Sequence, residues 1–536
     1  MAREGAFGWL DRSGRGPVSP GIGIAAGIGI ASHRVGTVMF RIFLALPLVL
    51  APLWAQQSQD EPRMVDLNIV AVDGHGAPIT DLNRDDFQIT DAGKQQRIAF
   101  FRHREGALRP PPQLEPGEFS NRSAANVPRA TLILFDLLNE KFATRGTTAN
   151  RLIQDLQAIE SPEYIYLYLI TVNGQLFAVH GLPGSEGEPI PEDGQPWTRH
   201  AKPLVDRALR TVLQTRDPGI IEDIQYRAEV TFRALDAVAA QLSSVPGRKS
   251  IVWLSDGVPI ELGPHRSDTG DFVDFTPMLR QMSENMDRSG VSIYPVRTIM
   301  LGSPDNIDGA ARDGESSLDT LDTFAHMTGG RPDAGKDVGA AVRQAISDMR
   351  TSYQIGYYPP GSNWDDKFHK LKIACARKGV HIQAKTGYYA WREAPGTHST
   401  QAMLEVLSAR FDAAEIGLRG RLIPGPKGSG AARLEAHIDA RDVVLVHQGD
   451  SYDGQLRLAM AGMIPGARPQ SSQIMPFDLH YTAQQRDQAL AQGIGFAQNI
   501  RLPENAAAIR LIVFDRNSQA IGSVTVPIAP AANTNH

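Results

Sequence analysis

The segment that decides the fold is Gly247-Arg248-Lys249-Ser250-Ile251-Val252-Trp253-Leu254-Ser255-Asp256-Gly257. An earlier run, Thr131 to Phe135, is equally apolar and also ends on an aspartate, Asp136. Continuous apolar runs of this length are typical of strands that are buried on both faces of a parallel sheet. Ligands meet the carboxyl ends of such strands, so we expect Asp136 and Asp256 to converge at one edge. The sequence therefore predicts an α/β domain with a mostly parallel sheet and a candidate site at that edge.

Short motifs elsewhere in the chain indicate a more specific class of protein. They occur in the order Asp81–Phe87, Pro246–Lys249, Met327–Arg331, Trp364–His369 and Lys385–Tyr389. Together with the two aspartates, these motifs resemble those of the bacterial VWFA-related secreted proteins, which are described mostly from acidobacteria. The resemblance covers residues 64 to 392. It implies a von Willebrand A-like, Rossmann-type domain with a mostly parallel sheet, flanked by β modules.

The remaining patterns divide the chain, which at 536 residues is too long for a single core. Residues 65–101 and 352–389 alternate apolar and polar side chains, as strands do. Because about 40 residues bury too small a core alone, we expect these segments to form one β module. Strands and Gly/Pro-rich turns after residue 410 predict a C-terminal antiparallel β-sandwich. The predicted regions are 1–55 (an extension and a signal peptide), 64–106 (the N-terminal β module), 107–128 (a proline-rich linker), 129–350 (the von Willebrand A-like domain), 351–392 (a β segment that packs with the N-terminal module), 393–409 (a junction) and 410–536 (the C-terminal sandwich).

An export signal is predicted near the N-terminus. A basic start at Met39-Phe40-Arg41 precedes the apolar stretch Ile42–Trp54 and the polar sequence after Ala55. These 13 apolar residues are too few to span a bilayer, so a cleaved signal peptide fits better than an anchor. We therefore expect a periplasmic or extracellular protein whose mature chain starts near Gln56 and has no stable membrane span.

The charge and the cysteine content argue against a nucleic-acid-binding protein and against a disulfide-stabilised one. The net charge is -5 and like charges form no run, so the sequence gives no electrostatic support for nucleic-acid binding. Cys375 is the only cysteine, which excludes an intramolecular disulfide.

The resemblance implies a magnesium or manganese site at the sheet edge. In von Willebrand A domains the ion is held by the first aspartate, two serines, a threonine and the later aspartate. Asp136 and Asp256 match this pattern, but Leu138 and Glu140 stand where the serines belong, and leucine cannot be a ligand. Thr231 lies inside a helix-like run, a poor position for a loop ligand.

Two interpretations of this edge stay open. In the first, Asp136, Asn139, Glu140 and Asp256 form a weakened site for Mg²⁺ or Mn²⁺. In the second, the two aspartates satisfy free N–H groups of loops and helix N-termini and hold no ion.

Other patterns typical of catalysis are incomplete. No Gly-x-Ser-x-Gly motif is present, and the histidines are scattered, with His369 expected at a strand edge. The segment 304–315 resembles a calcium loop, but Pro304 occupies the first ligand position, so a solvated acidic loop is expected.

The sequence thus predicts an exported, non-enzymatic binding protein whose partner is another protein or a cell-surface polymer. One alternative is a metal-assisted hydrolase that uses Asp136, Glu140 and Asp256. Another is a scaffold whose C-terminal sandwich binds the ligand.

Overall fold

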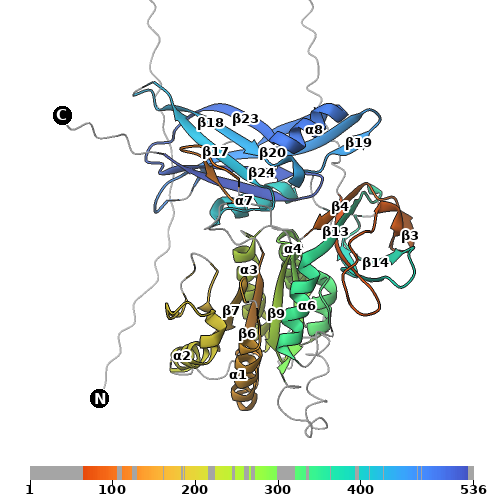
Figure 1. Ribbon diagram of the computed structural model, residues 1–536, viewed down its shortest axis with the longest axis vertical. Helices are drawn as coiled ribbons and strands as arrows, with labels where there is room; N and C mark the ends of the chain where they lie inside the picture. Colours follow the sequence, from red (N-terminus) through yellow and green to blue (C-terminus); the bar gives the residue numbers. More distant parts are fainter. Residues whose placement is uncertain are drawn as a thin grey trace, which may run out of the picture. The chain divides into compact units, whose positions relative to one another are not determined.

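The protein is a mixed α/β structure with several sheets (Figure 1). The predicted signal peptide and the acidic loop at 304–315 lie outside the residues that the structure describes. The computed structural model describes residues 64–105, 112–122, 129–160, 162–182, 185, 187–214, 224–243, 245, 248–258, 265–266, 272–298, 320–332, 337–361, 364–390, 392, 397–409, 411–426, 428–467, 469–471 and 474–528.

A five-stranded, mostly parallel sheet forms the centre of the α/β domain, as the apolar runs predicted. Its strand order is β12-β9-β6-β7-β8; the first four strands run parallel and β8 runs antiparallel to β7. All residues of β6, β7 and β9 are buried, which explains why their sequences are apolar without alternation. The bounds are β6 (Thr131–Asp136), β7 (Ile165–Ile170), β8 (Leu176–His180), β9 (Lys249–Ser255) and β12 (Val291–Arg297).

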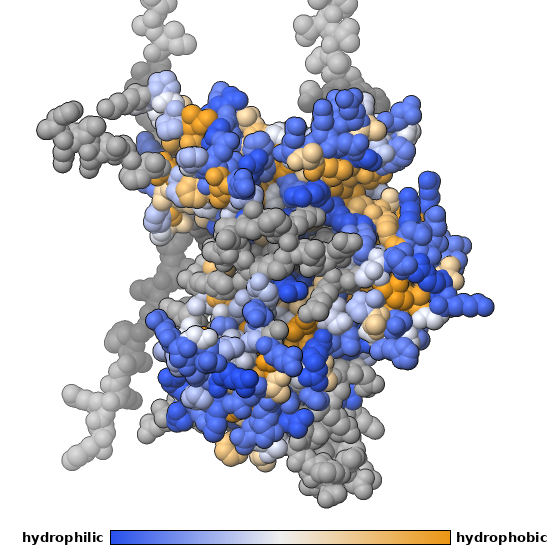
Figure 2. Space-filling view, viewed as in Figure 1, coloured by the Kyte–Doolittle hydropathy of each residue, from blue (hydrophilic) through white to orange (hydrophobic). Residues whose placement is uncertain are grey.

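Helices pack on both faces of this sheet. Leu134 and Trp253 face one core, which includes residues of α3 and α4, whereas Phe135 and Leu254 face a second core with residues of α1, α2 and α6. Figure 2 shows a largely hydrophilic surface over α1 and α2, as expected for helices with one buried face. No helix in the described part of the chain combines the length and apolar character that crossing a membrane needs. The helices are α1 (Phe142–Gln157), α2 (Ala201–Gln214), α3 (Ile224–Leu242), α4 (Thr276–Arg288) and α6 (Val338–Arg350), with a 3-10 turn η2 (Trp197–His200) and a further helical stretch at 320–328.

Segments from both sides of the α/β domain build the β module. One sheet has the order β15-β1-β13-β4 and the other the order β16-β14-β2-β3, so early and late strands alternate. The pairing expected between residues 65–101 and 352–389 is therefore present, with Leu67 opposite Ile355 and Ile89 opposite Ile373. The bounds are β1 (Val65–Val72), η1 (Arg84–Asp86), β2 (Phe87–Asp91), β3 (Lys94–Gln96), β4 (Phe100–Glu105), β13 (Thr351–Tyr357), β14 (Phe368–Cys375), β15 (His381–Gln383) and β16 (Gly387–Tyr389).

Two of the motifs that carry the family resemblance, Pro246–Lys249 and Met327–Arg331, meet where the β module joins the α/β domain. Arg248 donates to the carbonyl oxygens of Gly329 at 2.6 Å and Asn68 at 3.4 Å. Gly329 has a φ of +72°, and a side-chain carbon on Gly330 would lie 1.8 Å from the Ile293 carbonyl oxygen, so both positions require glycine. These motifs therefore have a structural role in joining the two parts.

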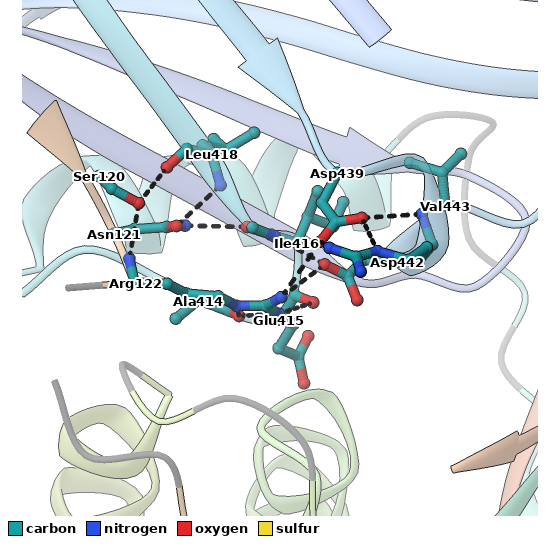
Figure 3. A network of polar contacts seen from close by, with 12 residues as sticks. Ser120, Asn121, Arg122, Ala414, Glu415, Ile416, Leu418, Asp439, Asp442 and Val443 are labelled. Carbon is teal, nitrogen blue, oxygen red and sulfur yellow. Dashed lines mark hydrogen bonds and ion pairs between the residues drawn. The ribbon is translucent and has the colours of Figure 1, made fainter. Parts of the chain in front are cut away.

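The predicted proline-rich linker contributes a strand to the C-terminal domain. Within residues 112–122, β5 (Phe119–Ser120) pairs antiparallel with β17 (Leu418–Pro424). The side-chain amide of Asn121 makes three hydrogen bonds of 2.7 to 2.8 Å with backbone groups of residues 413–418 (Figure 3). Arg122 pairs with the Asp442 carboxylate at 2.7 Å. This part of the linker is fixed along the edge of a sheet and does not act as a free spacer.

Two antiparallel sheets of the C-terminal domain share one apolar core. The first has the order β23-β18-β17-β5; in the second, β19-β20-β24-β25, the strands β21 and β22 also pair with β20. Leu434 of the first sheet packs in the same core as Leu458 and Leu511 of the second. The predicted junction at 393–409 contains a helix, α7. The bounds are α7 (Thr397–Ser408), β18 (Ala431–Ile438), η5 (Ala440–Asp442), β19 (Val446–Gln448), β20 (Ser451–Met463), β21 (Gln470–Ser471), β22 (Met475–Tyr481), α8 (Ala483–Gln492), β23 (Ile494–Arg501), β24 (Ala508–Asp515) and β25 (Ile521–Pro527), and a small pair β10 (His265–Arg266) and β11 (Phe272–Val273) lies in the α/β domain sequence.

Candidate functional site

The four residues predicted for the site gather around the loop between β6 and α1. Asp136, Asn139 and Glu140 are buried, with exposed fractions of 0%, 4% and 3%, and Asp256 is partly exposed. The backbone N–H of Asn139 donates to Asp136 at 3.0 Å, and that of Lys141 donates to Asp256 at 3.3 Å. The two aspartates thus hold the same loop, which is the capping role that the sequence left open.

Asp136 accepts hydrogen bonds at both carboxylate oxygens. Its Oδ1 accepts from the backbone N–H groups of Leu138 and Asn139 at 3.1 and 3.0 Å. Its Oδ2 accepts from the Asn139 side-chain amide at 2.8 Å, Ser255 Oγ at 2.9 Å and Trp253 Nε1 at 3.3 Å. Burial raises the pKa of Asp136, while the hydrogen bonds from Asn139 and Ser255 oppose that rise. Four of the five donors are N–H groups, which can only donate, and such a donor set favours the ionised carboxylate.

A second group of contacts surrounds the Asn139 side chain. Its amide nitrogen donates to Thr231 Oγ1 at 2.8 Å, and its carbonyl oxygen accepts from Arg227 Nη2 at 3.2 Å. Thr231 lies in α3 and its hydroxyl donates to the Arg227 carbonyl oxygen at 2.8 Å. Arg227 is therefore linked to Asp136 through one side chain, and its charge interacts with those of Asp136 and Asp256.

Glu140 is a second carboxyl group of the edge whose pKa is shifted toward the neutral form. Burial, together with the negative charges of Asp256 and Asp136, raises the pKa of Glu140 to about 8, although a hydrogen bond from Thr148 opposes the shift. Thr148 donates to Oε1, whereas Oε2 is buried and has no hydrogen-bond partner among the described residues. Glu140 is thus mostly protonated at neutral pH.

The magnesium or manganese ion implied by the resemblance does not fit this donor set. All of the lone pairs of Asp136 are engaged by the domain's own donors, and the second ligand position holds the buried, apolar Leu138. Asp256 accepts from the Thr298 hydroxyl at Oδ1 and from Lys141 N–H at Oδ2. Within the described ranges, no group of three or more His, Cys, Asp or Glu side chains is placed to hold a metal.

Sequence reasoning missed several residues of this site. Trp253 and Ser255 lie on β9, the neighbour of β6, and strand alternation places both on the same face of the sheet. Thr231 was discounted because it lies in a helix, yet it contacts Asn139 from there. Arg227 lies one helical turn before Thr231, so the helical period was an available signal for the pair.

The outer rim of the edge carries exposed aromatic and basic side chains. Phe142, the first residue of α1, is 76% exposed, the largest value among the exposed large apolar side chains in the described part of the chain. The Arg145 guanidinium lies 5.7 Å from the centre of its ring, and its Nη2 donates to the Leu137 carbonyl oxygen at 2.7 Å. Lys141 is exposed beside it, and Tyr226, near the start of α3, is 45% exposed. We call Lys141, Phe142, Arg145 and Tyr226 the aromatic–basic rim.

His369, the histidine that the sequence placed at a strand edge, is buried in a polar cluster inside the β module. The two ring nitrogens of the buried His369 lie 3.1 Å from Asp91 Oδ1 and 3.0 Å from Asp365 Oδ1. The hydroxyls of Tyr357 and Tyr388 both donate to Asp91 Oδ2 at 2.9 Å. Because these groups satisfy one another within the core, the cluster has a structural role.

Comparisons with known proteins identify no family for this chain, so the family resemblance depends on the sequence motifs alone. No protein-family model matches the chain, and a search of the curated proteins finds no similar sequence.

Proposed function

We propose that the protein is an exported, non-enzymatic binding protein that engages a partner protein through the aromatic–basic rim of a von Willebrand A-like domain. The 76% exposure of Phe142 is the observation that carries the proposal. An aromatic side chain left in water at a sheet edge has no role in the core, whereas aromatic and arginine side chains dominate the energetics of protein interfaces.

The fold supports this proposal. The order β12-β9-β6-β7, with aspartates following two neighbouring strands, is the arrangement that the resemblance implies for a von Willebrand A-like domain. The two C-terminal sheets that share a core are what a β-sandwich requires. The motifs of the VWFA-related secreted proteins and the predicted signal peptide support export.

The chemistry of the rim favours an acidic partner surface. Lys141 and Arg145 flank Phe142, and Glu140 behind them is mostly neutral at neutral pH. A partner that offers an apolar pocket bordered by carboxylates would complement both features. A cell-surface polymer remains the second class of partner, and it must carry negative charge for the same reason.

The geometry disfavours the hydrolase alternative. Metal-assisted or acid–base chemistry needs a carboxylate that reaches the substrate. Asp136 and Glu140 are 0% and 3% exposed, and Asp136 is saturated with internal donors. The edge therefore offers apolar and basic side chains to a partner, while Asp136 and Glu140 are buried.

Phe142→Ala in the mature chain tests the rim. The wild-type and variant proteins are compared in pull-downs from the periplasm or medium of the exporting cell, and the Kd of the captured partner is then measured. Removal of the anchor should weaken binding about 10-fold or more. Leu490→Ala in α8, where Leu490 is 38% exposed, is the matched control and should leave Kd unchanged. Equal affinities for wild type and Phe142→Ala, with a loss for Leu490→Ala, would favour the C-terminal domain as the binding part.

A further inference from the structure

We propose that the Arg227 guanidinium takes the place of a divalent cation at the sheet edge, so that the edge is assembled and charge-balanced without metal. This inference does not depend on the proposed binding function.

Both carboxylate oxygens of Asp136 are saturated with hydrogen bonds from donors of the same domain. Two carboxylate oxygens offer about four lone-pair positions, and here they receive five hydrogen bonds. An ion could bind Asp136 only after donors such as Ser255 Oγ or Trp253 Nε1 had been displaced. The indole N–H would then be buried without an acceptor, which is unfavourable.

A closed set of hydrogen bonds connects Arg227 to Asp136. Arg227 Nη2 donates to Asn139 Oδ1, and the Asn139 amide donates to both Asp136 and Thr231. The Thr231 hydroxyl in turn donates to the backbone of Arg227. The polar side chains that would surround an ion are thus oriented by the guanidinium and by one another.

The positive charge of Arg227 also opposes the binding of a metal ion at this edge. The Arg227 guanidinium interacts with the charges of both Asp136 and Asp256, so it balances negative charge at the edge. A divalent ion that entered here would add two positive charges beside Arg227, and their repulsion would oppose binding.

Metal titration of the wild-type mature chain is the direct test. We expect calorimetry with Mg²⁺ and Mn²⁺ to show no saturable heat, and the melting temperature to be the same with either ion and with a chelator. Saturable binding that Asp136→Asn abolishes would overturn the proposal.

A double-mutant cycle between Arg227 and Asp136 tests the charge relation itself. Arg227→Met leaves a buried carboxylate uncompensated, and Asp136→Asn leaves the cation without its partner, so each change should destabilise the domain. The double variant should be less destabilised than the sum of the two single changes, with a coupling of about 10-fold in the unfolding equilibrium constant. Additive effects would contradict the proposal.

Two further variants keep this test decisive. Arg151→Met in α1, where Arg151 pairs with Asp155 near the surface, is the control and should show no coupling to Asp136. If Arg227→Met does not fold, Arg227→Lys preserves the charge and should fold with a smaller loss of stability. Failure of both Arg227 variants while wild-type protein binds Mg²⁺ at Asp136 would also overturn the inference.

Discussion

Glu140 is a buried residue of this edge whose carboxyl group behaves differently from a glutamate in water. Its side chain replaces the hydroxyl that the family pattern has at this position, and it is buried next to two aspartates. The protein retains the proton on this group because the charged form would lack water and would be repelled by Asp136 and Asp256. The consequence is a dependence of stability on pH that a serine at position 140 would not produce.

Glu140→Gln tests that dependence. The pKa of Glu140 is about 8 in the folded protein and 4.5 for an unperturbed glutamate, so the folded state holds a proton that the unfolded state releases between these two values. Stability should therefore fall as pH rises through this window and level off above it, with a total loss on the order of 5 kcal/mol. Glutamine mimics the neutral carboxyl group and should remove most of this slope. Urea denaturation at about pH 6 and about pH 9 measures it.

The control for this comparison is Glu160→Gln, which changes an exposed glutamate in the same domain. That variant should follow the wild-type pH profile. A Glu140→Gln profile parallel to that of the wild type would show that Glu140 ionises normally in the folded state.

Strand β5 shows at the scale of an element how a two-residue pairing can be held in place by side chains. Asn121, which is 2% exposed, satisfies three backbone groups of residues 413–418, and Arg122 adds an ion pair to Asp442. The sequence around this strand is rich in proline, and its partner lies about three hundred positions later. The residues next to β5 in the sequence therefore predict only a linker, because the strand forms by pairing with the distant β17.

Asn121→Ala tests the importance of this attachment. The change leaves two buried carbonyl oxygens and one buried N–H without partners, so we expect a loss of roughly 3 kcal/mol in the stability of the C-terminal domain. Hydrogen exchange of residues 413–442, together with urea denaturation, measures the effect. Glu115→Gln removes a surface ion pair of the same segment with Arg421 and should change little. Equal effects of the two substitutions would mean that Asn121 does not anchor the strand.

At the scale of the whole molecule, the parts predicted well are those whose patterns are local. The central residues of β6 and β9 are apolar without alternation because both faces of these strands are covered, and this composition is visible in the sequence. The alternation of residues 65–101 and 352–389 likewise indicated strands that lack partners nearby. The candidate site was predicted only in part, because Arg227 and Thr231 reach Asn139 through the placement of α3 over the sheet. That placement depends on packing between distant segments, which no spacing in the chain reveals.

The attachment of β5 also sets an order of events while the chain is being made. Ser120 leaves the ribosome 298 residues before Leu418, its hydrogen-bond partner, and strands β1, β2 and β4 precede β13 and β14 by a similar interval. The α/β domain at 129–350 is contiguous and has its strands at hand, so we expect it to fold first and to bring the outer segments together. A message that stops early, anywhere before the codons for residues 413–442, yields a chain with unpaired strand edges. Such truncated chains should aggregate or be degraded. The early strands of the chain therefore reach a stable folded state only after residues near the C-terminal end have been made.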